Sequence, residues 1–310
     1  MKHTNKIILF SILTIASLVN VSCNRENKTD KEQKKNNYNL KDTMLLNQEN
    51  AMINEFHAYV DSLDSTNAVS AFLATEKFKT IFAGQSQGIC DSAFVIFLNL
   101  TDTLVVSLNY KLENDTTDYQ TFINSEISSP EVLQFRKSLS KNGFSLKSSD
   151  GMVYIDLNYD YIMQNFSSYV SDPMNAYLTE IQMENKEGFA QDAAIIIKPE
   201  KHVDRIIWYE NFIKQNPKFV LSDNCKNYRK AYFTYLLCGF DNTPLFSDKE
   251  TKELSSYFKT AYSYLLKKYP DSETAILVQP YYETLKQKQV DESQSLLKKY
   301  LIKGLIFNMN

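Results

Sequence analysis

The stretch CDSAFVIFLNLTDTLVVSLNYKL, residues 90–112, decides the fold class of this 310-residue chain. It is apolar along most of its length and contains neither glycine nor proline. Two arrangements fit it: two buried strands that turn at Thr101-Asp102, or one long buried helix that starts at Asp91. The length of the run favours the helix, because a buried strand typically has only about 4–8 residues. We therefore expect one long helix here.

Segments with helical signals flank this stretch on both sides, which supports the same choice. Met52, Phe56 and Val60 share one face of a helix expected over 44–63. Ser129-Pro130-Glu131 supplies an N-cap hydroxyl, a proline in the first turn and an acidic residue that favours a helix N-terminus. Ser247 and Glu250 have the spacing of a capping box. Helices are expected over about 44–63, 67–83, 130–142, 158–170, 172–186, 200–215, 223–238, 247–265, 272–287 and 292–303.

A single hairpin signal interrupts these helices. Residues 144–156 alternate apolar and polar side chains on both sides of Asp150-Gly151, a dipeptide typical of tight hairpin turns. We expect a mostly α fold, a multi-helix bundle or an irregular array of helical hairpins, with one small β-hairpin near 144–157. Residues 44–310 then form one helical domain, with a possible subdivision into 44–142 and 158–310. Residues 113–128 are predicted to be a loop and 193–198 a short extended segment.

The N-terminus has the pattern of an export signal. Lys2, His3 and Lys6 precede thirteen mostly apolar residues, Ile7 to Val19. As a helix this run is only about 20 Å long, shorter than the roughly 30 Å hydrocarbon core of a membrane. A basic head, a short apolar run and the small residue Ser22 indicate a secretory signal over residues 1–22.

Cys23 directly follows Ser22, and this arrangement resembles the lipobox of bacterial lipoproteins, although Asn20 stands where an aliphatic residue is usual. The resemblance implies lipidation of Cys23, with palmitate-type acyl chains, and a membrane anchor in the cell envelope, on the periplasmic face or the cell surface. Residues 24–37 contain no apolar residue, so 23–43 is predicted to be a flexible tether. The alternative is an ordinary cleaved signal that happens to be followed by cysteine.

Composition narrows the class of partner. The net charge is −3, which argues against a nucleic-acid partner, since such proteins need a basic face.

Lipidation of Cys23 leaves three further cysteines, Cys90, Cys225 and Cys238. A helix over 223–238 holds the last two about 20 Å apart, too far for a disulfide, which needs less than about 7 Å between Cα atoms. We expect buried free thiols, or at most a bridge from Cys90 to one of the others.

A short sequence pattern occurs at two of the expected helix ends. NFIKQNPKF (residues 211–219) and SYLLKKYPDS (residues 263–272) each place a bulky pair, a lysine and then a proline at a helix end. The second phrase, extended to LLKKYPDSETA, resembles the helix ends of tetratricopeptide-like envelope lipoproteins. That resemblance covers about 80 residues, and the spacing of 53 between Pro217 and Pro270 departs from the repeat of about 34. It implies paired helices that bind a partner protein.

No strong catalytic or metal motif is present. The chain lacks a glycine-rich phosphate loop, a Cys-x-x-Cys pair, a His-Glu-x-x-His helix and a Gly-x-Ser-x-Gly elbow. His57 and His202 are far apart in sequence, and both are expected to be partly exposed helix residues. We therefore expect no metal site and no cofactor.

The densest group of polar and aromatic residues lies between 154 and 210. Glu180, Glu184 and Glu187 share a helix face, and Arg205 lies one turn before Trp208. Aromatic faces beside carboxylates suit sugars or peptides, although a glutamate stripe is more often a solvated face. The candidate ligand-binding residues are Tyr159, Asp160, Tyr161, Glu180, Glu184, Arg205 and Trp208. Tyr228, Tyr232 and Tyr235 are predicted to form a core seam between helices.

The leading interpretation is a non-catalytic envelope lipoprotein whose helical, aromatic-rich body binds a protein or glycan partner. The alternative is a hydrolase of envelope glycan that uses a pair of carboxylates from the 156–192 region. Its candidate acids and bases are Glu180, Glu184, Asp160 and Asp192, since glycoside hydrolysis needs two carboxyl groups about 5–10 Å apart. A deep cleft with converging carboxylates would favour the hydrolase, and a shallow helical surface would favour the binding protein.

Overall fold

The computed structural model describes residues 36–115, 119, 129–149, 151–248 and 250–309. The expected signal, Cys23 and the first part of the expected tether lie outside the described residues, as does most of the loop predicted at 113–128. Helices make up 67% of the structure, with eleven helices and only small two-stranded antiparallel sheets in the described part. This confirms the mostly α fold class.

The residues that decide the fold form a single helix. Helix α3 (Gln87–Glu113) packs against α1 (Asn36–Asp61) and α2 (Val69–Phe82), so the two-strand alternative is wrong. Helix α1 begins at Asn36, before the predicted start at residue 44. Helix α6 (Tyr159–Phe166) adds an aromatic contact to α3, because the ring centroid of Phe166 lies 4.6 Å from that of Phe97.

Helix α3 also has the length and hydropathy of a membrane-spanning helix, the one helix of the described residues that does. Its packing accounts for this composition. Phe94, Phe97 and Leu104 are fully buried within the protein core, and 44% of the apolar window is buried in the same way. The buried part of the apolar run is therefore explained by the helices that pack on it.

The predicted hairpin is present and is held by α3. Strand β1 (Phe144–Ser149) pairs with β2 (Met152–Leu157) in antiparallel register, and Gly151 has the positive φ (77°) that the turn requires. The side-chain amide of Asn109 on α3 donates to the carbonyl of Ile155 and accepts from its N–H, at 2.7 and 2.8 Å. One asparagine thus occupies the free edge of β2. Helix α5 (Pro130–Lys141) begins at the predicted Ser129 cap and packs on β1.

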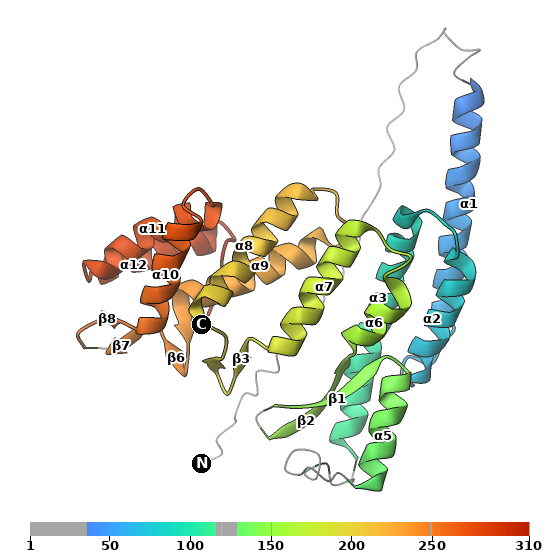
Figure 1. Ribbon diagram of the computed structural model, residues 1–310, viewed down its shortest axis with the longest axis horizontal. Helices are drawn as coiled ribbons and strands as arrows, with labels where there is room; N and C mark the ends of the chain where they lie inside the picture. Colours follow the sequence, from blue (N-terminus) through green and yellow to red (C-terminus); the bar gives the residue numbers. More distant parts are fainter. Residues whose placement is uncertain (1–35, 116–118, 120–128, 150, 249, 310) are drawn as a thin grey trace.

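The remaining helices follow one another along the long axis of the molecule, away from α1 (Figure 1). They pack mainly on their neighbours in sequence, which makes an array of helical hairpins. Their bounds are α6 Tyr159–Phe166, α7 Asp172–Glu187, α8 Pro199–Gln215, α9 Ser222–Cys238, α10 Ser256–Lys268, α11 Glu273–Lys286 and α12 Val290–Ile302.

Three short hairpins were not predicted, although one strand of the first, Ala194–Ile195, lies within the extended segment expected at 193–198. They pair β3 (Ala190–Gln191) with β4 (Ala194–Ile195), β5 (Gly239–Phe240) with β6 (Thr243–Pro244), and β7 (Phe246–Asp248) with β8 (Glu253–Leu254). The helix predicted over 247–265 is therefore wrong in its first part. Ser247 does not cap a helix; its hydroxyl donates to the carbonyl of Glu253 within the β7–β8 hairpin. Helix α10 starts only at Ser256.

The residues that precede Pro217 and Pro270 have nearly the same backbone conformation. Asn216 ends α8 with φ −124° and ψ 61°, and Tyr269 ends α10 with φ −130° and ψ 48°. Each donates its N–H to the residue four positions earlier and precedes a proline. The first helices of the pairs α8–α9 and α10–α11 thus end in the same way, although the connections that follow differ in length, and α8 packs directly on α10.

The cysteines agree with the expectation of free thiols. Cys90 and Cys225 are buried, Cys238 is partly exposed, and all three are unpaired. Burial raises the pKa of Cys90 and of Cys238 to about 11, so both remain protonated at neutral pH.

Candidate functional site

The candidate residues Glu184 and Arg205 do meet, but inside the protein. Glu184 lies on α7 and Arg205 on α8, and both side chains are more than nine-tenths buried. The Glu184 carboxylate accepts hydrogen bonds from the hydroxyls of Tyr232 and Tyr209, at 2.8 and 3.1 Å, and its other oxygen lies 3.9 Å from Nε of Arg205. The predicted pairing of the glutamate stripe with Arg205 is therefore present as a buried cluster.

The Arg205 guanidinium also binds the C-terminal end of α7. Its Nη2 donates to the carboxylate of Glu187 and to the carbonyl of Gly188, both at 2.9 Å. It also lies over the ring of Tyr232, 5.6 Å from the centroid. The Gly188 carbonyl belongs to the residue that caps α7, so Arg205 ties the end of α7 to α8 and α9.

Burial has a strong effect on the carboxylates of this cluster. Burial raises the pKa of Glu184 to about 7, even though the charge of Arg205 acts in the opposite direction. Burial likewise raises the pKa of Glu180, which lies one helical turn earlier and is 7% exposed. The expectation that the glutamate stripe is a solvated face is wrong for Glu180 and Glu184.

His202 extends the cluster and is fully buried, so the expectation of partial exposure is wrong. Its Nε2 lies 2.9 Å from the carbonyl of Tyr232, which can only accept a hydrogen bond, and its Nδ1 lies 3.2 Å from the hydroxyl of Tyr257. These partners fit the neutral ring with the proton on Nε2. Burial lowers the pKa of His202 to about 4. His57, in contrast, is exposed on α1, 3.1 Å from Asp61.

This histidine gives a testable pH dependence. An unfolded histidine has a pKa near 6.5, so between pH 6.5 and 4 the unfolded chain binds more protons and the free energy of unfolding falls on acidification. His202→Gln removes this effect, while Glu184 titrates in both proteins. We expect the stability difference between wild type and His202→Gln to be about 2 kcal/mol smaller at pH 5 than at pH 7. Urea unfolding at both pH values measures it, with His57→Gln as the control for an exposed histidine; an unchanged difference would contradict the buried neutral ring.

The other candidate residues do not join this cluster. Asp160 is exposed on α6 and pairs with Lys186 at 2.7 Å, and Tyr161 donates to the hydroxyl of Thr75. Tyr159 packs partly buried against the core. Trp208 stacks on Phe212, with ring centroids 4.8 Å apart, whereas the Arg205 guanidinium lies over the ring of Tyr232.

The hydrolase carboxylates do not share a cleft. Asp192 lies in the exposed β3–β4 turn, whereas Glu180 and Glu184 are interior. Two surface hollows of the described chain, on α10 and α12, are lined by none of these carboxylates. This arrangement does not favour acid and base chemistry, which needs access for a substrate.

The expected tyrosine seam is present. Tyr232 and Tyr235 are buried on α9, and the ring of Tyr228 stacks on that of Tyr209, 5.4 Å between centroids. Among the described residues no group of three or more His, Cys, Asp or Glu side chains is placed to hold a metal ion.

A second buried cluster centres on Glu210, for which the sequence predicted no role. Its carboxylate is 2% exposed and accepts from the N–H groups of Glu273 and Thr274, the first residues of α11, at 2.8 and 3.0 Å. Three side chains add to this: the Thr274 hydroxyl at 2.6 Å, and Arg229 and Lys214 at 3.0 Å each. Glu210 on α8 therefore caps the N-terminus of α11 from a different hairpin.

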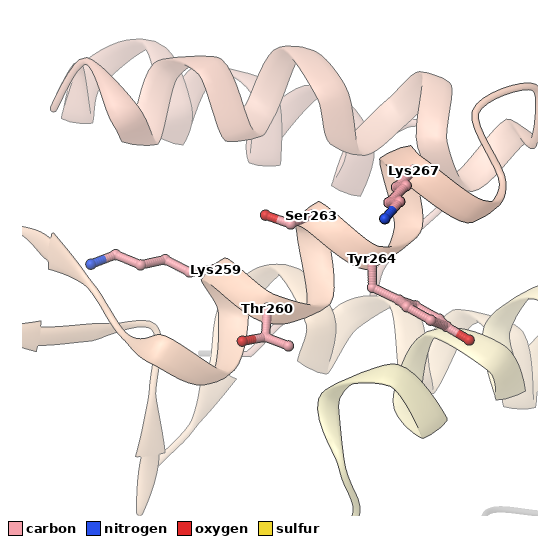
Figure 2. A pocket seen from close by; sticks show the side chains of 5 residues that line it. All are labelled: Lys259, Thr260, Ser263, Tyr264 and Lys267. Atoms are coloured by element: carbon pink, nitrogen blue, oxygen red, sulfur yellow. The ribbon is translucent and has the colours of Figure 1, made fainter.

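The surface beside these clusters is basic. One face of α10 forms a shallow, open hollow of about 400 Å³. Figure 2 shows the side chains that line it, with Tyr264 directed toward α8, where its hydroxyl donates to Asp204 at 3.0 Å. Lys259 pairs with Glu253 at the edge, and Lys267 has no ion-pair partner among the residues that the structure describes. The lining residues are Lys259, Thr260, Ser263, Tyr264 and Lys267.

Comparison with protein-family models, with curated proteins and with solved structures gives no match to this chain. The site is therefore interpreted from its own geometry.

Proposed function

We propose that this protein is a non-catalytic lipoprotein of a bacterial envelope, anchored through Cys23, whose helical array binds a protein or glycan partner outside the cytoplasm. The anchor rests on the sequence: a basic head, a short apolar run and Ser22-Cys23. The binding role rests on the helices α8–α12.

The observation that carries the binding role is the basic, open face of α10 beside α8. Helices α8 and α10 pack against each other, and such helical arrays present extended surfaces to partners. Lys259 and Lys267 lie eight residues apart on this face, with the hydroxyls of Thr260 and Ser263 between them. These donors suit a partner that carries carboxylates or hydroxyl groups.

The buried clusters support the same proposal. Glu184, one of the carboxylates that a hydrolase would use, accepts hydrogen bonds that join α7, α8 and α9. These bonds help to hold the helices at fixed positions. A rigid array favours binding, because little conformational entropy is then lost when a partner docks.

The anchor is tested by mass spectrometry of the membrane-extracted protein from its native host. We expect a mature N-terminus at Cys23 that carries the mass of acyl chains, and loss of both the acyl mass and membrane retention in Cys23→Ser. An unmodified N-terminus or a retained apolar segment would contradict the lipoprotein proposal.

The binding surface is tested by photo-crosslinking in the same host. A photoreactive residue at position 263 is expected to give a discrete crosslinked product that is lost when Lys259→Glu and Lys267→Glu are combined. The same residue at position 92, exposed on α3, is the matched control. Equal products from positions 92 and 263, or a product that survives the two lysine changes, would exclude the α10 face as the binding surface.

A further inference from the structure

Helix α12 has an outer face that nothing in the described chain covers. Its inner side is buried against α11, where Tyr300 donates to the carbonyl of Leu277 at 2.7 Å. Its outer side forms an open hollow of about 510 Å³. With α11 it makes the end of the molecule opposite α1 (Figure 1). The hollow is lined by Asp291, Glu292, Ser295, Leu296 and Lys299.

The charges on this face have a fixed order along the helix. Asp291 and Glu292 lie in its first turn, and Lys299 lies near its end. Glu292 and Lys299 are seven residues apart, which places them on one face about 10 Å apart along the axis. Neither has an ion-pair partner among the described residues, so both charges are available to another molecule.

The order of these charges makes the face complementary to the same face of a second, antiparallel copy of the helix. A two-fold axis through the midpoint between Ser295 and Leu296 places Glu292 opposite Lys299 of the partner subunit, and the same pair recurs by symmetry. It also places the bulky Leu296 beside the small Ser295 of the partner subunit. A two-fold interface requires this kind of reciprocal match between the same patch on both copies.

We propose that α12 is a self-association surface, on which two copies of this chain pair their α12 helices in antiparallel orientation. Ile302, at the end of the helix and near the edge of this face, is 77% exposed and adds apolar area beside the charged pairs. A contact between two helices of about 20 Å lies at the small end of specific interfaces. The dimer is therefore in equilibrium with the monomer and forms at high protein concentration.

Charge reversal tests the pairing directly. Sedimentation of the full-length chain in detergent is expected to show a concentration-dependent dimer for the wild type. Glu292→Lys places two lysines opposite each other at both symmetric positions, and Lys299→Glu places two glutamates there. Each single variant is expected to raise the dimer dissociation constant at least about tenfold, because like charges face each other.

Recovery of the dimer by compensating charge changes distinguishes loss of the Glu292–Lys299 pair from a general loss of structure. An equimolar mixture of the two single variants is expected to form a heterodimer, and Glu292→Lys combined with Lys299→Glu in one chain is expected to form a homodimer again. Glu113→Lys on α3 and Lys141→Glu on α5, both exposed and distant from α12, are the matched controls and should dimerise as the wild type does. A wild type that stays monomeric, or a mixture that does not associate, would overturn the proposal. Neither result depends on the lipid anchor or on the α10 face.

Discussion

Glu210→Gln is expected to lower the free energy of unfolding by about 3–5 kcal/mol, the usual cost of breaking a buried ion pair by changing one partner. The carboxylate of Glu210 accepts from two backbone N–H groups of α11, one hydroxyl and two cations. A glutamine has one acceptor oxygen, and its NH₂ group would face these donors. Urea unfolding followed by far-ultraviolet circular dichroism measures the loss.

Glu273→Gln is the matched control, because Glu273 contacts the same cations but is 56% exposed. Its substitution is expected to cost less than about 1 kcal/mol. Burial acts to raise the pKa of Glu210, but the hydrogen bonds from Thr274, Lys214 and the α11 backbone outweigh it and lower the pKa to about 2. The stabilisation by Glu210 is therefore complete above pH 4.5 and is lost as the pH falls toward 2. Equal losses for Glu210→Gln and Glu273→Gln would contradict the capping of α11 by α8.

Arg205→Met is expected to cost a similar amount, about 3–5 kcal/mol at pH 7, since it removes the cation from a buried cluster while it keeps most of the side-chain volume. The carbonyl of Gly188 then loses a hydrogen-bond donor, and the carboxylate of Glu184 loses a nearby positive charge. Loss of the cation raises the pKa of Glu184 further, so the folded variant binds a proton more tightly than the unfolded chain. Its stability should fall as the pH rises from 6 to 8, more steeply than that of the wild type.

Glu187→Gln provides the comparison for Arg205, because Glu187 pairs with the same guanidinium but is 36% exposed. It is expected to cost less than half as much and to leave the pH dependence close to that of the wild type. The same deficit for Arg205→Met at pH 6 and pH 8 would show that Glu184 is not coupled to Arg205. Both variants can be followed by the same urea titrations.

The helices could be predicted from the sequence because their signals are local. A proline after a capping hydroxyl at Ser129, an apolar run without glycine over 90–112, and Asp150-Gly151 between alternating residues each specify the backbone within a few positions. The short hairpins could not be predicted in the same way. The β3–β4 turn uses Asp192 and Ala193 at positive φ, where no glycine marks it, and it is held by hydrogen bonds from Asn242, fifty residues away.

The sequence was sufficient to predict that the glutamate face meets Arg205, but not that these side chains are buried. Helical spacing placed Glu180, Glu184 and Glu187 on one face, and the structure brings this face to Arg205. Helical spacing alone does not show whether such a face contacts water or another helix. Tyr232 and Tyr209, which donate to one oxygen of Glu184, come from two other helices, so the environment of the carboxylate depends on tertiary packing. The role of Glu210 depends in the same way on α11, more than sixty residues later.

The stacking of Trp208 on Phe212 has a practical consequence for the unfolding of the two ends of the molecule. Trp208 is the single tryptophan of the chain, and it lies on α8, so its fluorescence reports the environment of the helical array while α1–α3 contribute none. Circular dichroism, in contrast, averages over every helix. Coincident transitions by the two signals would mean that the array and the aromatic core of α1–α3 open as one cooperative unit. An earlier or later change in tryptophan emission would mean that the two ends are separate folding units joined by the Asn109-bound hairpin.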